Sequence, residues 1–149
     1  MHYSLQGNHG HLIVEAHDRE ALGRGMMAIG ARLARAVNRV AKHTGPVLAD
    51  RFHARTLPTP RECHRALRYV LLNARRHAVR TRAALATAVR VDPASSGRWF
   101  DGWKRERGFV TERAQSTLPE RPAVARARTW LLTVGWRRHG LLDPADVPG

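Results

Sequence analysis

The sequence is poor in cysteine, lysine and acidic residues, and it has no long apolar run. Cys63 is its single cysteine, which excludes an internal disulfide. No stretch approaches the roughly 20 apolar residues of a membrane-spanning helix, so we expect no membrane partner. The opening residues MHYSLQGNHG lack the basic and apolar regions of a secretory signal. This predicts a cytoplasmic protein in a reducing compartment.

What the sequence has in excess is positive charge. Its 149 residues include 26 Lys and Arg against 12 Asp and Glu, for a formal net charge of +14. Only Lys42 and Lys104 are lysines, and an arginine fork can donate two hydrogen bonds to one phosphate. The charge therefore favours nucleic acid as the partner. The alternative is that arginine serves here only as a solubilising surface residue.

The first half of the chain predicts a hairpin and a helix. Residues 2–6 and 9–16 read as strands, and Gly7-Asn8 between them is a turn signal. Asp18 can cap the helix that follows, which should end before Gly45 and Pro46. Apolar residues recur along it at spacings of three and four, which predicts one buried stripe. The stripe consists of Leu22, Met26, Ile29, Leu33 and Val37.

A second helix has a clear start. Residues 46–57 before it read as a strand or an extended segment. Thr59 can cap the helix, Pro60 suits its first position and Glu62 completes a capping box. The helical pattern continues to residue 90, as one element or as two joined near His77–Arg82.

Two histidines stand side by side at the start of the second strand. Residues i and i+2 of a strand point to the same face, so His9 and His11 project together. Such a pair suits a divalent metal ion. The alternative is an ordinary surface pair, because His-x-His alone is a weak signal.

The second helix offers partners for these histidines. Tyr69 and Asn73 are four residues apart and share one helix face, away from the middle of the apolar stripe. The amide oxygen of Asn73 could be a third metal ligand, with Tyr69 beside the metal. Arg65 and Arg76 fall near the Tyr69 side, where they could hold phosphate. The alternative for Tyr69 is a half-buried ring with its hydroxyl in water.

Three motifs in order carry a family resemblance. They are Asn8-His9-Gly10-His11 after a strand and turn, Arg51-Phe52, and Tyr69-Val70-Leu71-Leu72-Asn73. Over roughly residues 2–80 the chain resembles the REP-associated tyrosine transposases, a branch of the single-tyrosine HUH transposases. That family carries Asn-His-hydrophobic-His, then Arg-Tyr or Arg-Phe on a strand, then Tyr-x-x-x-Asn on its catalytic helix.

The resemblance implies a fold and a chemistry. The fold would be α+β, a partial ferredoxin-like HUH core of β-hairpin, helix, strand and catalytic helix, with a helical C-terminal extension. Residues 1–90 would form the catalytic domain and 91–149 an extension of unknown role. His9, His11 and Asn73 would hold Mg²⁺ or Mn²⁺, and Tyr69 would cleave single-stranded DNA through a 5′-phosphotyrosine.

The family binds imperfect DNA hairpins, so the resemblance also implies DNA contacts. The candidate arginines outside the second helix lie on the first helix and after it. They are Arg32, Arg35, Arg39 and Arg51.

Two departures from the family pattern bear on activity. Gly10 replaces the usual hydrophobic residue between the histidines, and glycine weakens a strand. The family's first strand and first helix have no counterpart here. We expect an upstream start, a second protomer that completes the sheet in a homodimer, or an inactive relic. The alternative function is a non-catalytic nucleic-acid-binding protein.

The last third of the chain is rich in aromatic residues outside this resemblance. They could stack on unpaired bases, but aromatic residues more often anchor cores, and we predict mainly packing. These residues are Trp99, Phe100, Trp103, Trp130 and Trp136. His53, His64 and His77 have no evident partner in the sequence, and we interpret them as surface or structural residues.

Overall fold

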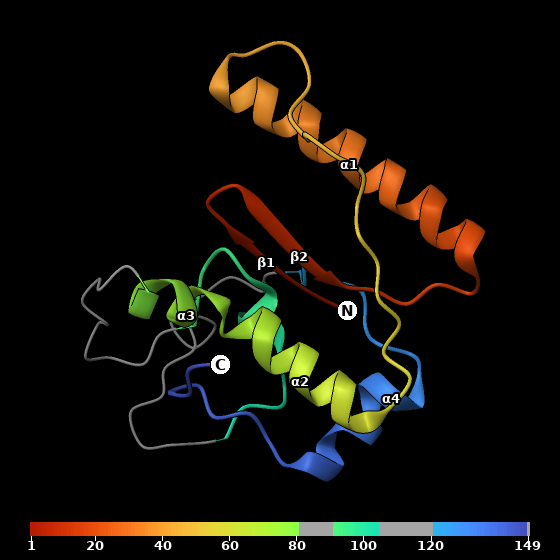
Figure 1. Ribbon diagram of the computed structural model, residues 1–149, viewed down its shortest axis with the longest axis vertical. Helices are drawn as coiled ribbons and strands as arrows, with labels where there is room; N and C mark the ends of the chain where they lie inside the picture. Colours follow the sequence, from red (N-terminus) through yellow and green to blue (C-terminus); the bar gives the residue numbers. More distant parts are fainter. Residues whose placement is uncertain (81–90, 105–120, 149) are drawn as a thin grey trace. The chain divides into compact units, whose positions relative to one another are not determined.

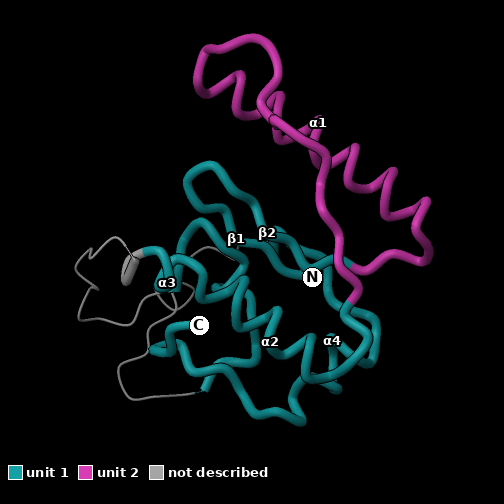
Figure 2. The backbone as a smooth tube through the Cα atoms, viewed as in Figure 1, with its two compact units in different colours: residues 1–14, 57–149 teal, residues 15–56 magenta. Residues whose placement is uncertain are grey.

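The computed structural model describes residues 1–80, 91–104 and 121–148, with no side-chain description for residues 78–80 (Figure 1). The described residues form a mixed α+β structure with a two-stranded antiparallel sheet and four α-helices. They divide into two compact units, coloured in Figure 2. One unit contains residues 1–14 and 57–149, and the other contains residues 15–56.

The predicted hairpin is confirmed. Strand β1 (His2–Gln6) pairs with β2 (His9–Ile13) around a turn in which Gly7 has a φ of 51°. Strand β2 ends at Ile13 rather than at residue 16, because Ile13 lies opposite His2, the first residue of β1. Residues 14–16 therefore have no partner on that strand.

Residues 94–96 pair with the edge of β1 that faces away from β2. Ser95 forms an antiparallel bridge with Ser4, and the Leu5 amide donates to the Ala94 carbonyl at 2.9 Å. The Ser96 hydroxyl accepts from the amide of Tyr3 at 2.9 Å. Residues on both sides of position 90 thus belong to the same packed unit.

Helix α2 (Pro60–Leu71) begins as the sequence predicts. The Thr59 hydroxyl accepts from the Glu62 amide at 3.2 Å and donates to the Glu62 carboxylate at 2.8 Å. The apolar face of α2 is buried against the hairpin and the C-terminal segment, by which we mean residues 91–104 and 121–148. Burial of this face, more than helix propensity, stabilises a helix of this length.

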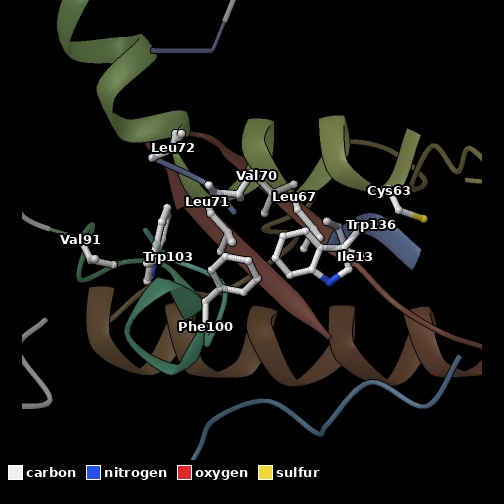
Figure 3. Close-up of a cluster of buried hydrophobic side chains, with 11 residues drawn as sticks. Ile13, Cys63, Leu67, Val70, Leu71, Leu72, Val91, Phe100, Trp103 and Trp136 are labelled. Carbon is white, nitrogen blue, oxygen red and sulfur yellow. The ribbon is translucent and has the colours of Figure 1, made fainter. Parts of the chain in front are cut away.

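The core of this unit draws on three parts of the chain (Figure 3). The hairpin, α2 and the C-terminal segment each contribute buried apolar side chains. These are Ile13, Cys63, Leu67, Val70, Leu71, Leu72, Val91, Phe100, Trp103, Trp136 and Leu142.

Three of the five aromatic residues predicted to pack are buried, whereas Trp99 is half-buried and Trp130 is 48% exposed. Phe100 lies between the two buried tryptophans, with ring centroids 5.1 Å from Trp103 and 5.3 Å from Trp136. The Trp103 indole donates to the Gly97 carbonyl at 2.9 Å, which satisfies its buried nitrogen. In the sequence, Phe100 comes directly after a 3₁₀-helix, η1 (Ser96–Trp99).

The C-terminal extension, expected to be helical, contains two short helical elements after residue 129. Helix α4 (Trp130–Thr133) is followed by a 3₁₀-helix, η3 (Gly135–His139), which packs against α2. Gly135 lies against the Trp130 ring, since a Cβ there would be only 2.8 Å from Trp130 Cζ3. This close approach needs glycine, which also weakens a continuous helix.

The long helical pattern breaks earlier than the sequence indicates. Helix α2 ends at Leu71, and α3 (Asn73–Arg80) begins after Leu72, whose φ of −109° and ψ of 12° are not helical. The expectation of one continuous helix is therefore wrong, whereas the alternative junction near His77–Arg82 extends beyond the described residues. Residues 81–90 lie outside the described residues. Tyr69 and Asn73, expected on one continuous helix, belong to two helices.

The second unit centres on α1 (Arg19–Ala41), capped as predicted by Asp18, which accepts from the Ala21 amide at 2.7 Å. The expectation of a buried stripe is wrong, because no α1 residue is buried and Ile29 is 40% exposed. Its own unit adds only the irregular residues 42–56, too little to cover a 23-residue helix. The strand predicted within 46–57 does not form. No described helix combines the length and apolarity needed to cross a membrane.

Candidate active site

The two histidines of the hairpin share a face with the inner residues of β1. His11 lies opposite Ser4 and His9 lies opposite Gln6 in the strand register. Their rings stack nearly parallel, with centroids 6.4 Å apart and planes at 16°. His9 is exposed, whereas His11 is partly buried. The strand geometry therefore places both imidazoles side by side.

Neighbouring side chains constrain this pair. The Asn8 carboxamide oxygen lies 2.5 Å from His9 Nδ1, and because an amide oxygen can only accept, His9 donates from Nδ1 in this contact. Gln6 donates to the Ser4 hydroxyl at 3.2 Å and to the Asp92 carboxylate. These contacts involve only Nδ1 of His9 and tie Gln6, the residue opposite it, to Ser4 and Asp92.

Tyr69 comes from α2 to meet this face. Its ring and that of His11 form a T-shaped contact, with centroids 5.2 Å apart and planes at 82°. The contact joins residues 58 positions apart in the chain, because α2 packs against both strands. Tyr69 itself is partly buried beside the core. The Tyr69 ring of α2 therefore lies next to the His11 ring of β2, which in turn stacks with His9.

The protonation of His11 suits metal binding. Burial lowers the pKa of His11 below its ordinary value, and the nearby His9 and His77 lower it further. The imidazole is therefore neutral near pH 7, the form that coordinates a cation. His77, an exposed residue of α3, contributes to this shift through its charge, and the sequence interpretation assigned it no partner. Its position four residues after Asn73 was the signal that could have placed it near this site.

Arg76 lies over the Tyr69 ring. Its guanidinium carbon is 5.2 Å from the centre of the Tyr69 ring, within the range of a cation–π contact. Arg65 is exposed on α2. A positive charge next to the phenol favours an anion at this position.

Asn73 has an unusual environment. It is fully buried, and neither its amide nitrogen nor its amide oxygen has a hydrogen-bond partner in the part of the chain that the structure describes. It therefore makes no hydrogen bond to either imidazole. A buried amide without a partner costs free energy, which is typical of a group kept for a ligand.

Among the described residues, no His, Cys, Asp or Glu completes a three-ligand site with His9 and His11. Among residues 1–80, 91–104 and 121–148, no group of three His, Cys, Asp or Glu is arranged to hold a metal ion. The imidazoles of His9 and His11 fit a cation by their chemistry, and the orphaned amide oxygen of Asn73 fits a third ligand in the same way.

The other predicted DNA contacts belong to the second unit. Arg32, Arg35 and Arg39 are exposed on α1, and Arg51 is exposed in the irregular segment after it. Arg51-Phe52 is not on a strand, unlike the corresponding pair in the family that the sequence resembles.

Comparisons with protein-family models, with curated proteins and with solved structures find no match for this chain.

Proposed function

We propose that this protein is a metal-dependent nuclease and strand transferase of single-stranded or hairpin DNA, similar to the single-tyrosine HUH transposases. The observation that supports this most is the contact between His11 and Tyr69. It joins two of the three motifs on which the resemblance rests, although they are far apart in the sequence.

In the proposed reaction Tyr69 is the nucleophile. Its phenol oxygen attacks the phosphorus of a phosphodiester, a Tyr–O–P bond forms and the bond to the 3′ oxygen breaks. The phenol proton ends on the departing 3′ hydroxyl, so the reaction is a balanced transesterification. The 5′-phosphotyrosine keeps the phosphodiester energy, and a second 3′ hydroxyl can reverse the step without ATP.

The surrounding residues bind and orient the DNA. His9, His11 and Asn73 would hold Mg²⁺ or Mn²⁺, which supplies Lewis-acid polarisation of the phosphodiester. Asn8 orients His9 through its hydrogen bond. Arg76 on α3, which lies over the Tyr69 ring, and Arg65 on α2 bind the phosphate oxygens. The DNA backbone would also be contacted by four arginines of the second unit, Arg32, Arg35, Arg39 and Arg51. A homodimer would pair two active sites.

A non-catalytic nucleic-acid-binding protein, or an inactive transposase relic, is the second candidate. Two observations favour it. Among the described residues no group of three His, Cys, Asp or Glu is arranged to hold a metal ion, and their sheet has two strands only. This candidate keeps the DNA binding that the net charge of +14 predicts, without the chemistry.

A covalent trapping experiment separates the two. The protein is incubated with end-labelled hairpin DNA and Mn²⁺, denatured and run on a gel. A labelled band at the mass of the protein plus DNA is expected for the wild type and absent for Tyr69→Phe. Tyr3→Phe is the matched control, because Tyr3 is the other of the two tyrosines, and it should keep the band. An identical result for Tyr69→Phe and the wild type would rule out Tyr69 as the nucleophile.

A further inference from the structure

The C-terminal segment has a charge pattern that the proposed active site does not use. From residue 121 to residue 141 the chain has no Asp or Glu. The same stretch holds five arginines, of which four are exposed and one is half-buried. They are Arg121, Arg126, Arg128, Arg137 and Arg138. A polyanion is the partner that such a stretch favours.

One tryptophan within this stretch is not used in the core. Trp130 is 48% exposed, whereas Trp103 is 7% and Trp136 is 1% exposed. Its ring is positioned by the close approach to Gly135, where a Cβ would lie 2.8 Å from Cζ3. The indole is thus held in place at the surface with a large part of its area in water.

Arg138 is paired with this indole. Its guanidinium carbon lies 4.8 Å from the centre of the Trp130 ring. No carboxylate of the described residues pairs with Arg138, whereas the neighbouring Arg137 forms an ion pair with Asp101 at 2.7 Å. Within the described part of the chain, the charge of Arg138 at the exposed ring is therefore not paired with a carboxylate.

We propose that Trp130 and Arg138 form a stacking site for an unpaired base of a nucleic-acid strand. The indole supplies a flat π surface on which any base can stack, and Arg138 supplies the charge for the adjacent phosphate. The other exposed arginines of residues 121–141 extend the attraction along the backbone. This site goes beyond the proposed function, because it includes none of the residues of the candidate active site and requires no chemistry at Tyr69.

Single strands fit this surface better than a folded protein or a duplex. A protein partner would also favour Trp and Arg, but its surface would need to be unusually acidic to match a stretch without any carboxylate. In a duplex the base faces are already stacked, so an exposed indole gains nothing from them. The proposed occupant is therefore an unpaired segment, such as the flank of a hairpin.

The test measures affinity for a short oligodeoxythymidylate, which has unpaired bases and forms no hairpin. Trp130→Phe keeps an aromatic face and should bind within about 3-fold of the wild type. Trp130→Leu keeps an apolar contact with Gly135 but has no π surface, and we expect roughly a 5- to 50-fold loss. Binding should also quench tryptophan fluorescence in the wild type, and less so in Trp130→Phe.

Matched controls separate stacking from charge and from folding. Arg138→Gln should weaken binding more than Arg61→Gln, an exposed arginine at the start of α2 whose removal changes the net charge equally. Thermal unfolding shows that each variant is folded. Tyr69→Phe should bind the oligonucleotide as the wild type does, so a failure of the proposed chemistry leaves this result unchanged. Wild-type affinity in Trp130→Leu, or equal losses for Trp130→Phe and Trp130→Leu, would overturn the proposal and leave a protein contact as the role of Trp130.

Discussion

The rings of His11 and Tyr69 meet nearly at a right angle, with their centroids 5.2 Å apart. One ring comes from an N-terminal hairpin and the other from a helix that begins after residue 59. Their meeting depends on the packing of α2 against both strands, and on the C-terminal aromatic cluster that supports α2. The candidate site therefore rests on the core of the same unit.

Filling Gly10 should strengthen the strand that carries the histidines. A Cβ at Gly10 would meet only the flexible Leu5 Cδ2, at 3.3 Å, and glycine weakens a strand. Gly10→Val should raise the free energy of unfolding by about 0.5–1 kcal/mol and tighten Mn²⁺ binding. Urea denaturation and Mn²⁺ titration measure the two effects. Gly7→Val is the control and should destabilise, because Gly7 has a φ of 51°. A destabilised Gly10→Val protein would contradict this prediction.

Asn73 should contribute to function at the expense of stability. Its amide is fully buried without a hydrogen-bond partner among the described residues. Asn73→Leu removes this orphaned group at similar volume, and should raise the free energy of unfolding in EDTA by about 1–2 kcal/mol. The same variant should bind Mn²⁺ more weakly if Asn73 is a ligand. Loss of stability in EDTA would instead mean that the amide has a structural partner.

Acidification should destabilise the fold through His2. Burial is the main reason that the pKa of His2 falls from 6.5 to about 4; the Met1 amino group lowers it further, and Asp101 opposes both. Between these two values the unfolded chain binds the extra proton and the folded chain does not. The free energy of unfolding should therefore fall as the pH drops from 6.5 toward 4, by about 3 kcal/mol in total.

Urea denaturation at a series of pH values measures this loss. His2→Gln should show a shallower dependence on pH, because the titrating group is gone. The pKa values of His11 and His64 are also lowered, mainly by burial, so part of the dependence should remain. Parallel curves for the variant and the wild type would show that His2 does not titrate in this window.

The aromatic cluster should not tolerate added volume at Gly102. A Cβ there would lie 2.2 Å from Trp136 Cη2 and 2.5 Å from Phe100 Cζ, both in the core. Gly102→Ala should therefore destabilise by about 1–3 kcal/mol through overpacking. Gly25→Ala on α1 is the matched control, because nothing lies within 4 Å of its Cβ. It should stabilise by about 0.5–1 kcal/mol, and thermal unfolding of both variants compares the two effects.

Features governed by neighbouring residues could be predicted from the sequence. The hairpin follows from Gly7-Asn8 between two short apolar segments, and the start of α2 follows from Thr59 and Glu62. Side-by-side projection of His9 and His11 needs only the period of a strand. The packing of Phe100, Trp103 and Trp136 follows from the general tendency of aromatic residues to anchor cores.

Features that depend on distant contacts could not be predicted. Leu72 ends α2 although no proline or glycine marks it, and its side chain is buried in the core. The stripe of α1 has the spacing of a buried face, but spacing cannot show whether anything covers it. His77 affects the pKa of His11, 66 positions earlier in the chain, and this depends on α3 packing near the hairpin.

Paramagnetic broadening by Mn²⁺, observed by NMR, tests most directly whether the hairpin and α2 share one cation site. At low Mn²⁺ the signals of His9, His11 and Tyr69 should broaden first. His64 and His139, a second pair of histidine rings 5.9 Å apart, serve as the internal comparison and should stay sharp. In His9→Ala/His11→Ala protein the Tyr69 signals should also stay sharp. Equal broadening at His64 and His139, or broadening of Tyr69 that survives loss of both hairpin histidines, would contradict a shared site.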